Sequence, residues 1–226
     1  MLLALDTSTE TAGIALHDGE RLAESVWPAG RTQTTSVLPE IDALLARCGS
    51  SIEDVGAVAV AIGPGTFTGL RVGLSIAKGL VLARDLPVIG VPTLAIAAAP
   101  FVQAEVSVLA VLPAGRGRVV SARVPAQGRM DDPANMAFAD FVAHAEVEGL
   151  LVLGELSAEQ RAALTDRGVR VASAGASVRR PAVLAELAMA RWAAGETDDP
   201  ATLEPLYVHG VQATTKPVVD RLRRSS

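Results

Sequence analysis

The sequence predicts an α/β fold built from mixed sheets that are flanked by helices. Short apolar runs typical of buried strands alternate with longer segments of helical period, in the order β-β-β-α-β-α-β-α over roughly the first hundred residues. Of the 226 residues, 50% are hydrophobic but only 3% are aromatic, so we expect a core of Ala, Val and Leu. This length suits one compact unit or two small lobes.

An opening meander of three strands is predicted before the first helix. The run LLALD, residues 2–6, is apolar and ends in an acid, which is typical of a buried strand. Residues 11–27 give two further strands joined at Asp18-Gly19, because this pair accepts the positive φ of a tight hairpin turn.

The segment 34–48 has the period of an amphipathic helix, which Gly49 is expected to end. We expect Cys48 to be buried on its apolar face, as a small hydrophobe. The members of this face are Val37, Leu38, Ile41, Leu44, Leu45 and Cys48.

The rest of the chain alternates between the two patterns. Apolar runs predict strands at 57–62, 87–91, 106–113, 117–125, 150–154 and 169–173. Helical periods predict helices at 68–85, 93–102, 138–147, 157–168 and 181–195. We expect a boundary between Pro100 and Gln103, which gives a lobe at 1–102 and a smaller lobe, with a tail, at 103–226.

Composition limits the location and the partners. The net charge of −5 argues against a domain that binds nucleic acid alone, because neutralising phosphates requires a basic face. The N-terminus lacks the basic region of a signal peptide, and no apolar run approaches the roughly 20 residues that span a bilayer. We therefore expect a cytoplasmic protein without a membrane contact. The basic residues Lys216, Arg221, Arg223 and Arg224 are interpreted as part of a solvated, frayed terminus.

No metal site is predicted. The single cysteine can form neither an internal disulfide nor a thiolate metal cage. The three histidines, His17, His144 and His209, fall in an expected hairpin, a helix and the tail, without the spacing of metal ligands.

The stretch GPGTFTGLRVG, residues 63–73, concentrates glycine directly after an apolar run. It fails the Walker pattern, since Leu70-Arg71 follows Gly69, and it fails the dinucleotide fingerprint, which would need glycine at Thr68. What remains is a turn that leads into a helix, whose first N–H groups could receive an anion.

Small residues also line one side of the helix that follows, since Gly65, Gly69, Gly73 and Ala77 recur every four positions. Glycine inside a helix costs about 1 kcal/mol relative to alanine, so close approach of a second backbone must offset it. That backbone could belong to this chain or to another protein, and the spacing does not separate the two.

Three segments together resemble one family. Residues 3–16 (LALDTSTETAGIAL), 63–80 and 86–95 resemble the TsaB (YeaZ) family of bacterial tRNA threonylcarbamoyladenosine biosynthesis proteins. Residues 203–216 resemble the Pro-x-Tyr segment near that family's C-terminus. The resemblance implies two ribonuclease-H-like lobes of the actin, Hsp70 and sugar-kinase superfold.

The same resemblance implies phosphate or nucleotide contacts after the first strand and at the glycine turn. The residues concerned are Asp6, Thr7, Ser8, Gly63 and Gly65. In kinase-like relatives Asp6 would orient a metal-bound or attacking water, and the alternative is a turn cap. Gln33 stands where the paralogue TsaD carries a histidine of its metal motif. Pro113-Ala114-Gly115-Arg116 replaces an Asp-Ala-Arg segment found in many relatives.

These departures favour a subunit without catalytic residues of its own. The implied role is to support TsaD, together with the ATPase TsaE, in transferring a threonylcarbamoyl group to the N6 of the adenosine next to the anticodon. Threonylcarbamoyl-adenylate would be the donor. The chain would need no cofactor, would meet tRNA only through the complex, and would form a homodimer when alone. The resemblance leaves open whether ATP or ADP binds at the junction between the subunits.

We expect helices 34–48 and 66–83 to dock TsaD or a second copy of the chain. On this hypothesis, Gly69→Leu abolishes the complex and leaves the monomer folded. The alternatives are an active ATPase, a sugar-type kinase or a peptidase of the same superfold, and a homodimer with no other partner. The expected interface residues are Val37, Leu38, Ile41, Leu45, Thr68, Gly69, Arg71, Val72, Gly73 and Ile76.

Overall fold

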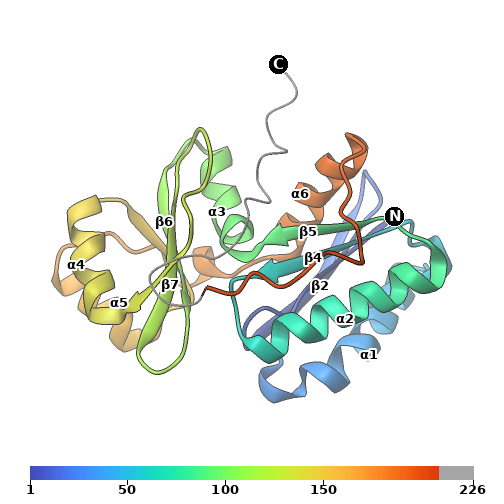
Figure 1. The fold of residues 1–226 in the computed structure, drawn as a ribbon, viewed down its shortest axis with the longest axis horizontal. Coiled ribbons are helices and arrows are strands. Elements are labelled where there is room, and N and C mark those ends of the chain that lie inside the picture. The colour runs from blue at the N-terminus through green and yellow to red at the C-terminus, as the bar shows by residue number, and fades with distance from the viewer. Residues whose placement is uncertain (209–226) are drawn as a thin grey trace.

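The computed structural model describes residues 1–208, apart from the side chain of Arg31, and arranges them as two sheets flanked by helices (Figure 1). The predicted mixed α/β architecture is confirmed. Among these residues, no helix combines the length and the apolar character that crossing a membrane requires. The predicted tail, with His209 and the four basic residues after it, lies outside the described residues.

The first sheet has the strand order β3-β2-β1-β4-β5. β2 runs antiparallel to β1 and β3, whereas β4 is parallel to both β1 and β5. The predicted meander is confirmed, and its hairpin turns at Gly19 with φ of 103°. The strands are β1 Leu2–Asp6, β2 Thr11–His17, β3 Leu22–Pro28, β4 Ala57–Gly63 and β5 Val88–Pro92.

Helices cover both faces of this sheet (Figure 1). α1 (Gln33–Arg47) and α2 (Phe67–Arg84) pack their apolar sides on one face, and α3 (Thr93–Gln103) and α6 (Pro181–Ala193) pack on the other. Burial on both faces explains why β1 and β4 are continuous apolar runs and not alternating ones.

The second sheet has the order β8-β7-β6-β9. α3 packs against one of its faces through Leu94 and Ala98, and α4 and α5 cover the other. Because α3 also contributes Ile96 and Ala99 to the core of the first sheet, one helix lies between the two sheets. The elements are β6 Val108–Pro113, β7 Arg118–Val124, β8 Ala134–Ala137, α4 Phe138–Glu148, β9 Leu151–Gly154 and α5 Ala158–Asp166.

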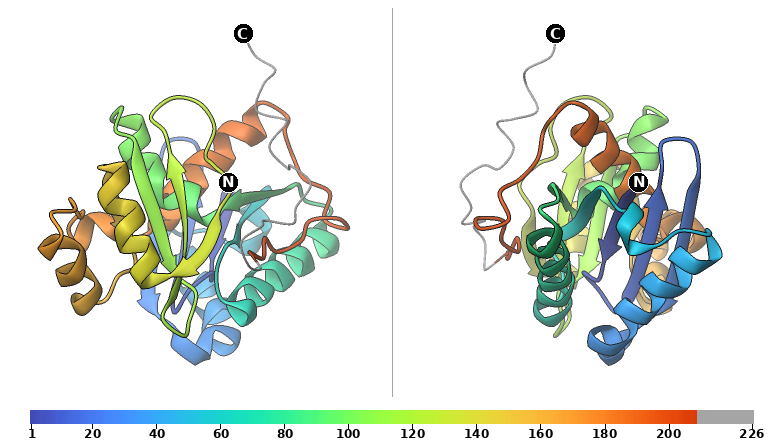
Figure 2. Two further views of the ribbon diagram at one scale, coloured as in Figure 1. Left: turned by 60° about the vertical axis from the view of Figure 1, so that its left-hand side comes forward. Right: turned by 90° about the vertical axis from the view of Figure 1, so that its right-hand side faces the viewer.

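The chain returns to the first sheet after the second is complete. α6 lies on the first sheet, and Asp198 forms a bridge with Val88 at the edge of β5. Leu203 then enters the core beneath α2, and the amide of Leu206 donates to the carbonyl of Ile62. Figure 2 shows this last segment running along the first sheet toward α2. The first sheet is thus built from strands that precede residue 103, and the second from strands that follow it. Part of the range 103–226 nevertheless packs against the first sheet.

Two expectations about local structure are wrong. Residues 169–173 form no strand, because only Val171 bridges to β9. Cys48 is exposed, since α1 ends at Arg47 and the chain turns away from the sheet at Gly49, where φ is 65°.

Replacing Phe141 by alanine should lower the free energy of unfolding by about 3–5 kcal/mol, because the ring is fully buried and its removal leaves a cavity. Val147→Ala on the same helix should change it by less than about 0.5 kcal/mol, since Val147 is 86% exposed. Urea unfolding followed by circular dichroism measures both. Equal effects would contradict the packing described for α4.

Candidate functional site

Four consecutive polar side chains between β1 and β2 are buried. Asp6, Thr7, Ser8 and Thr9 are each at most 2% exposed. The backbone amide and the hydroxyl of Ser8 donate to Asp6 Oδ1 at 3.0 and 2.6 Å, which makes a turn that holds the carboxylate. The hydroxyl of Thr7 donates to the carbonyl of Gly69 at 2.7 Å. Buried polar groups require such partners, and this loop obtains them from its own turn and from α2.

Glycines in α2, and Gly65 in the turn before it, allow this loop to lie directly against the helix. A Cβ atom on Gly65 would lie 2.2 Å from the Ser8 carbonyl oxygen, and one on Gly69 only 2.0 Å from that of Thr7. A Cβ on Gly73 would meet the Thr7 hydroxyl at 2.4 Å. The second backbone is therefore the chain's own loop.

Two expectations are corrected by this contact. Gly69 and Gly73 were assigned to a protein interface, but Thr7 fills the space beside them, so no foreign helix can lie there. A Gly69→Leu side chain would collide with the backbone of Thr7, and the folded monomer could not accept it without moving the loop.

The turn at Gly63 and Gly65 is likewise surrounded by the chain itself. The amide of Gly63 donates to the Thr93 hydroxyl at 3.1 Å, and a Cβ at Gly63 would lie 2.6 Å from the carbonyl oxygen of Leu206. The amide of Thr66 donates to the Ser8 carbonyl, and the Thr66 hydroxyl accepts from the amide of Gly69. Thr66 thus caps α2 in the ordinary way.

Asp6 is paired with Arg179, a residue that the sequence did not mark. Arg179 precedes α6, and its guanidinium is 3% exposed. Its Nε donates to Asp6 Oδ2, its Nη2 to the hydroxyl of Thr9 at 3.0 Å, and its Nη1 to Glu155 Oε1 at 2.6 Å. Glu155 directly follows β9 of the second sheet.

The environment keeps Arg179 charged. Burial acts to lower the pKa of its guanidinium, but the carboxylates of Asp6 and Glu155 outweigh this effect and hold the pKa above its ordinary value. Asp6 and Arg179 are 173 positions apart, so no local pattern in the sequence could reveal the pair.

Gln33 has a structural role in the same region. It is buried, and its side-chain amide donates to the carbonyl of Thr9, which ties the start of α1 to the loop. In the segment Pro113-Ala114-Gly115-Arg116, Pro113 ends β6 and the other three residues lie in the turn that leads to β7. Among residues 1–208, no group of three or more His, Cys, Asp or Glu side chains is arranged to hold a metal ion.

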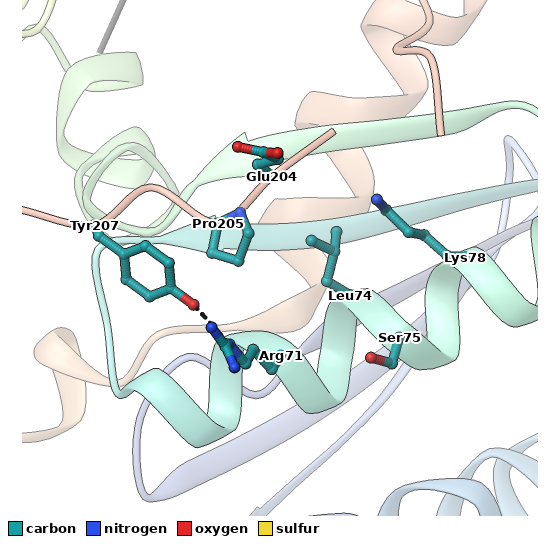
Figure 3. A pocket seen from close by; sticks show the side chains of 7 residues that line it. All are labelled: Arg71, Leu74, Ser75, Lys78, Glu204, Pro205 and Tyr207. Carbon is teal, nitrogen blue, oxygen red and sulfur yellow. Dashed lines mark hydrogen bonds between the residues drawn. The ribbon is translucent and has the colours of Figure 1, made fainter. Parts of the chain in front are cut away.

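A groove lies between α2 and residues 204–207, near the end of the described part of the chain (Figure 3). Tyr207 accepts a hydrogen bond from Arg71 Nε at 3.1 Å, and its ring stacks on Phe67 with centroids 5.6 Å apart. Arg71 also lies over the Phe67 ring, 3.7 Å from its centroid. The glycine-rich stretch and the Pro-x-Tyr segment are thus in contact. The groove has a volume of about 340 Å³ and is lined by Arg71, Leu74, Ser75, Lys78, Glu204, Pro205 and Tyr207.

The expected interface residues divide into two groups. Val37, Ile41 and Leu45 are at most 3% exposed and belong to the core of the first sheet, so they cannot contact a partner in this conformation. An amphipathic helix buries its apolar stripe on its own sheet, and the sequence could not distinguish this from docking. The accessible remainder is Leu38, Thr68, Arg71, Val72 and Ile76. Together with the exposed Phe67, which the sequence did not mark, these residues form what we call the α1–α2 surface.

Comparison with known proteins identifies the family. A family model described as TsaD, tRNA N6-adenosine threonylcarbamoyltransferase, matches residues 28–186, which is more than half of the chain. The chain belongs to this family. The TsaD family match and the structural relatives described next confirm the predicted superfold of two ribonuclease-H-like lobes.

Several relatives of this chain are proteins named TsaB. The tRNA threonylcarbamoyladenosine biosynthesis protein TsaB of Haemophilus influenzae is 49% identical over 94 residues, which are 41% of this chain and 39% of that protein. The predicted resemblance to TsaB is confirmed. The chain spans about two fifths of the length of the TsaB relatives it matches.

Two longer matches cover nearly the whole chain. An uncharacterized protein of Mycobacterium tuberculosis is 34% identical over 210 residues, 92% of this chain and 90% of that protein. A crystal structure from Pseudomonas aeruginosa, titled an uncharacterized protein with similarity to peptidase YEAZ, is 28% identical. It covers 92% of this chain and 99% of its own, with a TM-score of 0.74.

Gly69→Ala should lower the free energy of unfolding by roughly 1–3 kcal/mol, because the new methyl group would collide with the Thr7 carbonyl. Gly79→Ala, in the same helix, has open space around its Cβ and should raise it by about 1 kcal/mol through helix propensity alone. Chemical denaturation of the two variants checks this. A stabilised Gly69→Ala protein would show that the loop does not press on α2.

Proposed function

We propose that the chain is a non-catalytic subunit of the complex that transfers a threonylcarbamoyl group to the N6 of the adenosine next to the anticodon in tRNA. TsaD would be the catalytic partner, TsaE would complete the complex, and tRNA would be met only through it. The observation that carries this proposal is the similarity to proteins named as TsaB within the family of the transferase TsaD.

The hydrogen bonds and the burial of the Asp6 carboxylate support a subunit without catalytic activity. A general base or a metal ligand must direct a free lone pair at the reacting atom or the metal. The Asp6 carboxylate instead accepts hydrogen bonds from Ser8 and Arg179 and is almost completely buried. A nucleotide phosphate could bind at Asp6, Thr7 and Ser8 only if these hydrogen bonds were broken. Contacts of ATP or ADP with these residues stay a prediction, as does a nucleotide at the subunit junction.

The α1–α2 surface is the proposed docking site for TsaD, and for a second copy when the chain is alone. Leu38 is 50% and Phe67 56% exposed, so two large apolar side chains face outward on the two neighbouring helices. Arg71 stands beside them with its guanidinium stacked on Phe67. Aromatic and arginine side chains in such a patch are typical anchors of protein interfaces.

An active enzyme is the alternative function. One structural relative is titled as similar to a peptidase, and the exposed Cys48 removes one argument against a nucleophile in this chain. Purified chain incubated with ATP and with peptide substrates distinguishes the two proposals. Turnover of either by the chain alone would favour the enzyme.

Reconstitution tests the proposed role. TsaD, TsaE, tRNA and threonylcarbamoyl-adenylate should give modified adenosine in the presence of this chain and far less in its absence. The chain alone should transfer nothing, because its one buried carboxylate at this site is occupied by Arg179. Mass spectrometry of digested tRNA measures the product. Full modification without the chain would contradict the proposal.

Leu38→Asp and Arg71→Glu should each weaken the association with TsaD by at least about tenfold, because they place a carboxylate in the apolar centre of the proposed interface. Val147→Asp, at a still more exposed apolar position on α4 of the other lobe, is the control and should leave association unchanged. Co-purification and mass photometry of the mixtures measure the effect. If all three variants bind alike, the docking site lies elsewhere.

A further inference from the structure

Carboxylates from both sheets converge on the Arg179 guanidinium. Asp6 is the last residue of β1 in the first sheet, and Glu155 directly follows β9 in the second. We propose that Arg179 is an internal cation that fastens the two lobes together and withholds Asp6 from any external cation.

All three nitrogens of the guanidinium are used within this cluster. Nε and Nη2 face Asp6, Nη2 also donates to the Thr9 hydroxyl, and Nη1 faces Glu155. Thr9 in turn donates to Glu155 Oε1 at 2.8 Å. Arginine suits this position because its planar fork presents several donors in fixed directions, whereas lysine offers a single point charge.

The charges explain why the cluster holds the two lobes together. Asp6 and Arg179 are each 3% exposed as side chains, and Glu155 is 26% exposed. Two carboxylates share one guanidinium, so removing Arg179 would leave two negative groups close together and poorly solvated. Breaking a buried ion pair by deleting one partner is strongly unfavourable. Without Arg179, the two carboxylates would repel each other unless another cation took its place.

The oxygen atoms around the guanidinium suit such a replacement. Two carboxylates and a hydroxyl are the ligands that hard divalent cations such as Mg²⁺ accept. In the intact chain Arg179 occupies that space and supplies the positive charge. The proposal therefore predicts that the intact chain gains no stability from Mg²⁺ at Asp6, and that a chain without the guanidinium does.

Chemical rescue tests this directly. Arg179→Ala should lower the melting temperature markedly, and low-millimolar guanidinium or methylguanidinium should restore much of the loss. Mg²⁺ should restore part of it, and tetramethylammonium at the same ionic strength should restore none. The intact chain should respond to none of these ions. Arg180→Ala is the matched control, because the adjacent Arg180 pairs with Glu24 at the surface and its side chain is 57% exposed.

Two outcomes would overturn the proposal. One is an Arg179→Ala protein that melts like the intact chain or gains nothing from guanidinium and from Mg²⁺. The other is an intact chain that is itself stabilised by Mg²⁺ in a manner that Asp6→Asn abolishes.

Two milder variants decide the question if Arg179→Ala does not fold. Arg179→Lys keeps the charge but not the fork, so its melting temperature should lie below that of the intact chain. Glu155→Gln should speed amide hydrogen exchange at the end of β9 and leave the centre of β1 protected. A Lys variant as stable as the intact chain, or unchanged exchange in Glu155→Gln, would refute the fastening role.

Discussion

The contact between Thr7 and the glycines of α2 is the constraint on which the rest of the site depends. Two backbones approach here more closely than any side chain would allow, and the Thr7 hydroxyl completes the contact with a hydrogen bond to Gly69. Each glycine inside α2 costs about 1 kcal/mol in helix stability, which the packing of the loop offsets. With the loop fixed in this way, the carboxylate of Asp6 and the hydroxyl of Thr9 are directed together at Arg179.

The sequence predicted most of the framework because its signals there are local. The Asp18-Gly19 turn, the apolar run of β4 and the helical period of α2 each lie within one element, and each is found where expected. The sequence does not show, however, what the apolar face of an element packs against. Val37, Ile41 and Leu45 form an apolar stripe that would look the same against a partner as against the sheet that buries it.

Arg179 shows what sequence patterns cannot supply. Its carboxylate partners are the last residue of β1 and the residue that follows β9, and only the folded topology brings them together. The glycine stripe was ambiguous for the same reason, since spacing reveals that a close neighbour exists but not which segment it is. The prediction that Cys48 is buried was wrong for a local reason. The helical period placed this residue on the apolar face, but the helix ends one residue earlier.

The two sheets share more than the charged cluster. α3 contributes to the cores of both, and α6 and Leu203 return to the first sheet after the second is built. The face that α6 covers includes Leu2 and Ala4 of β1 and Ile89 of β5, which all precede α6 by more than 90 residues.

During synthesis on the ribosome, these early strands emerge long before the helix that shields them. Until α6 leaves the exit tunnel, α3 alone covers that apolar face of the first sheet. Fragments that stop after α3 would expose the part of this face that α6 covers, so the first sheet is unsuited to independent expression.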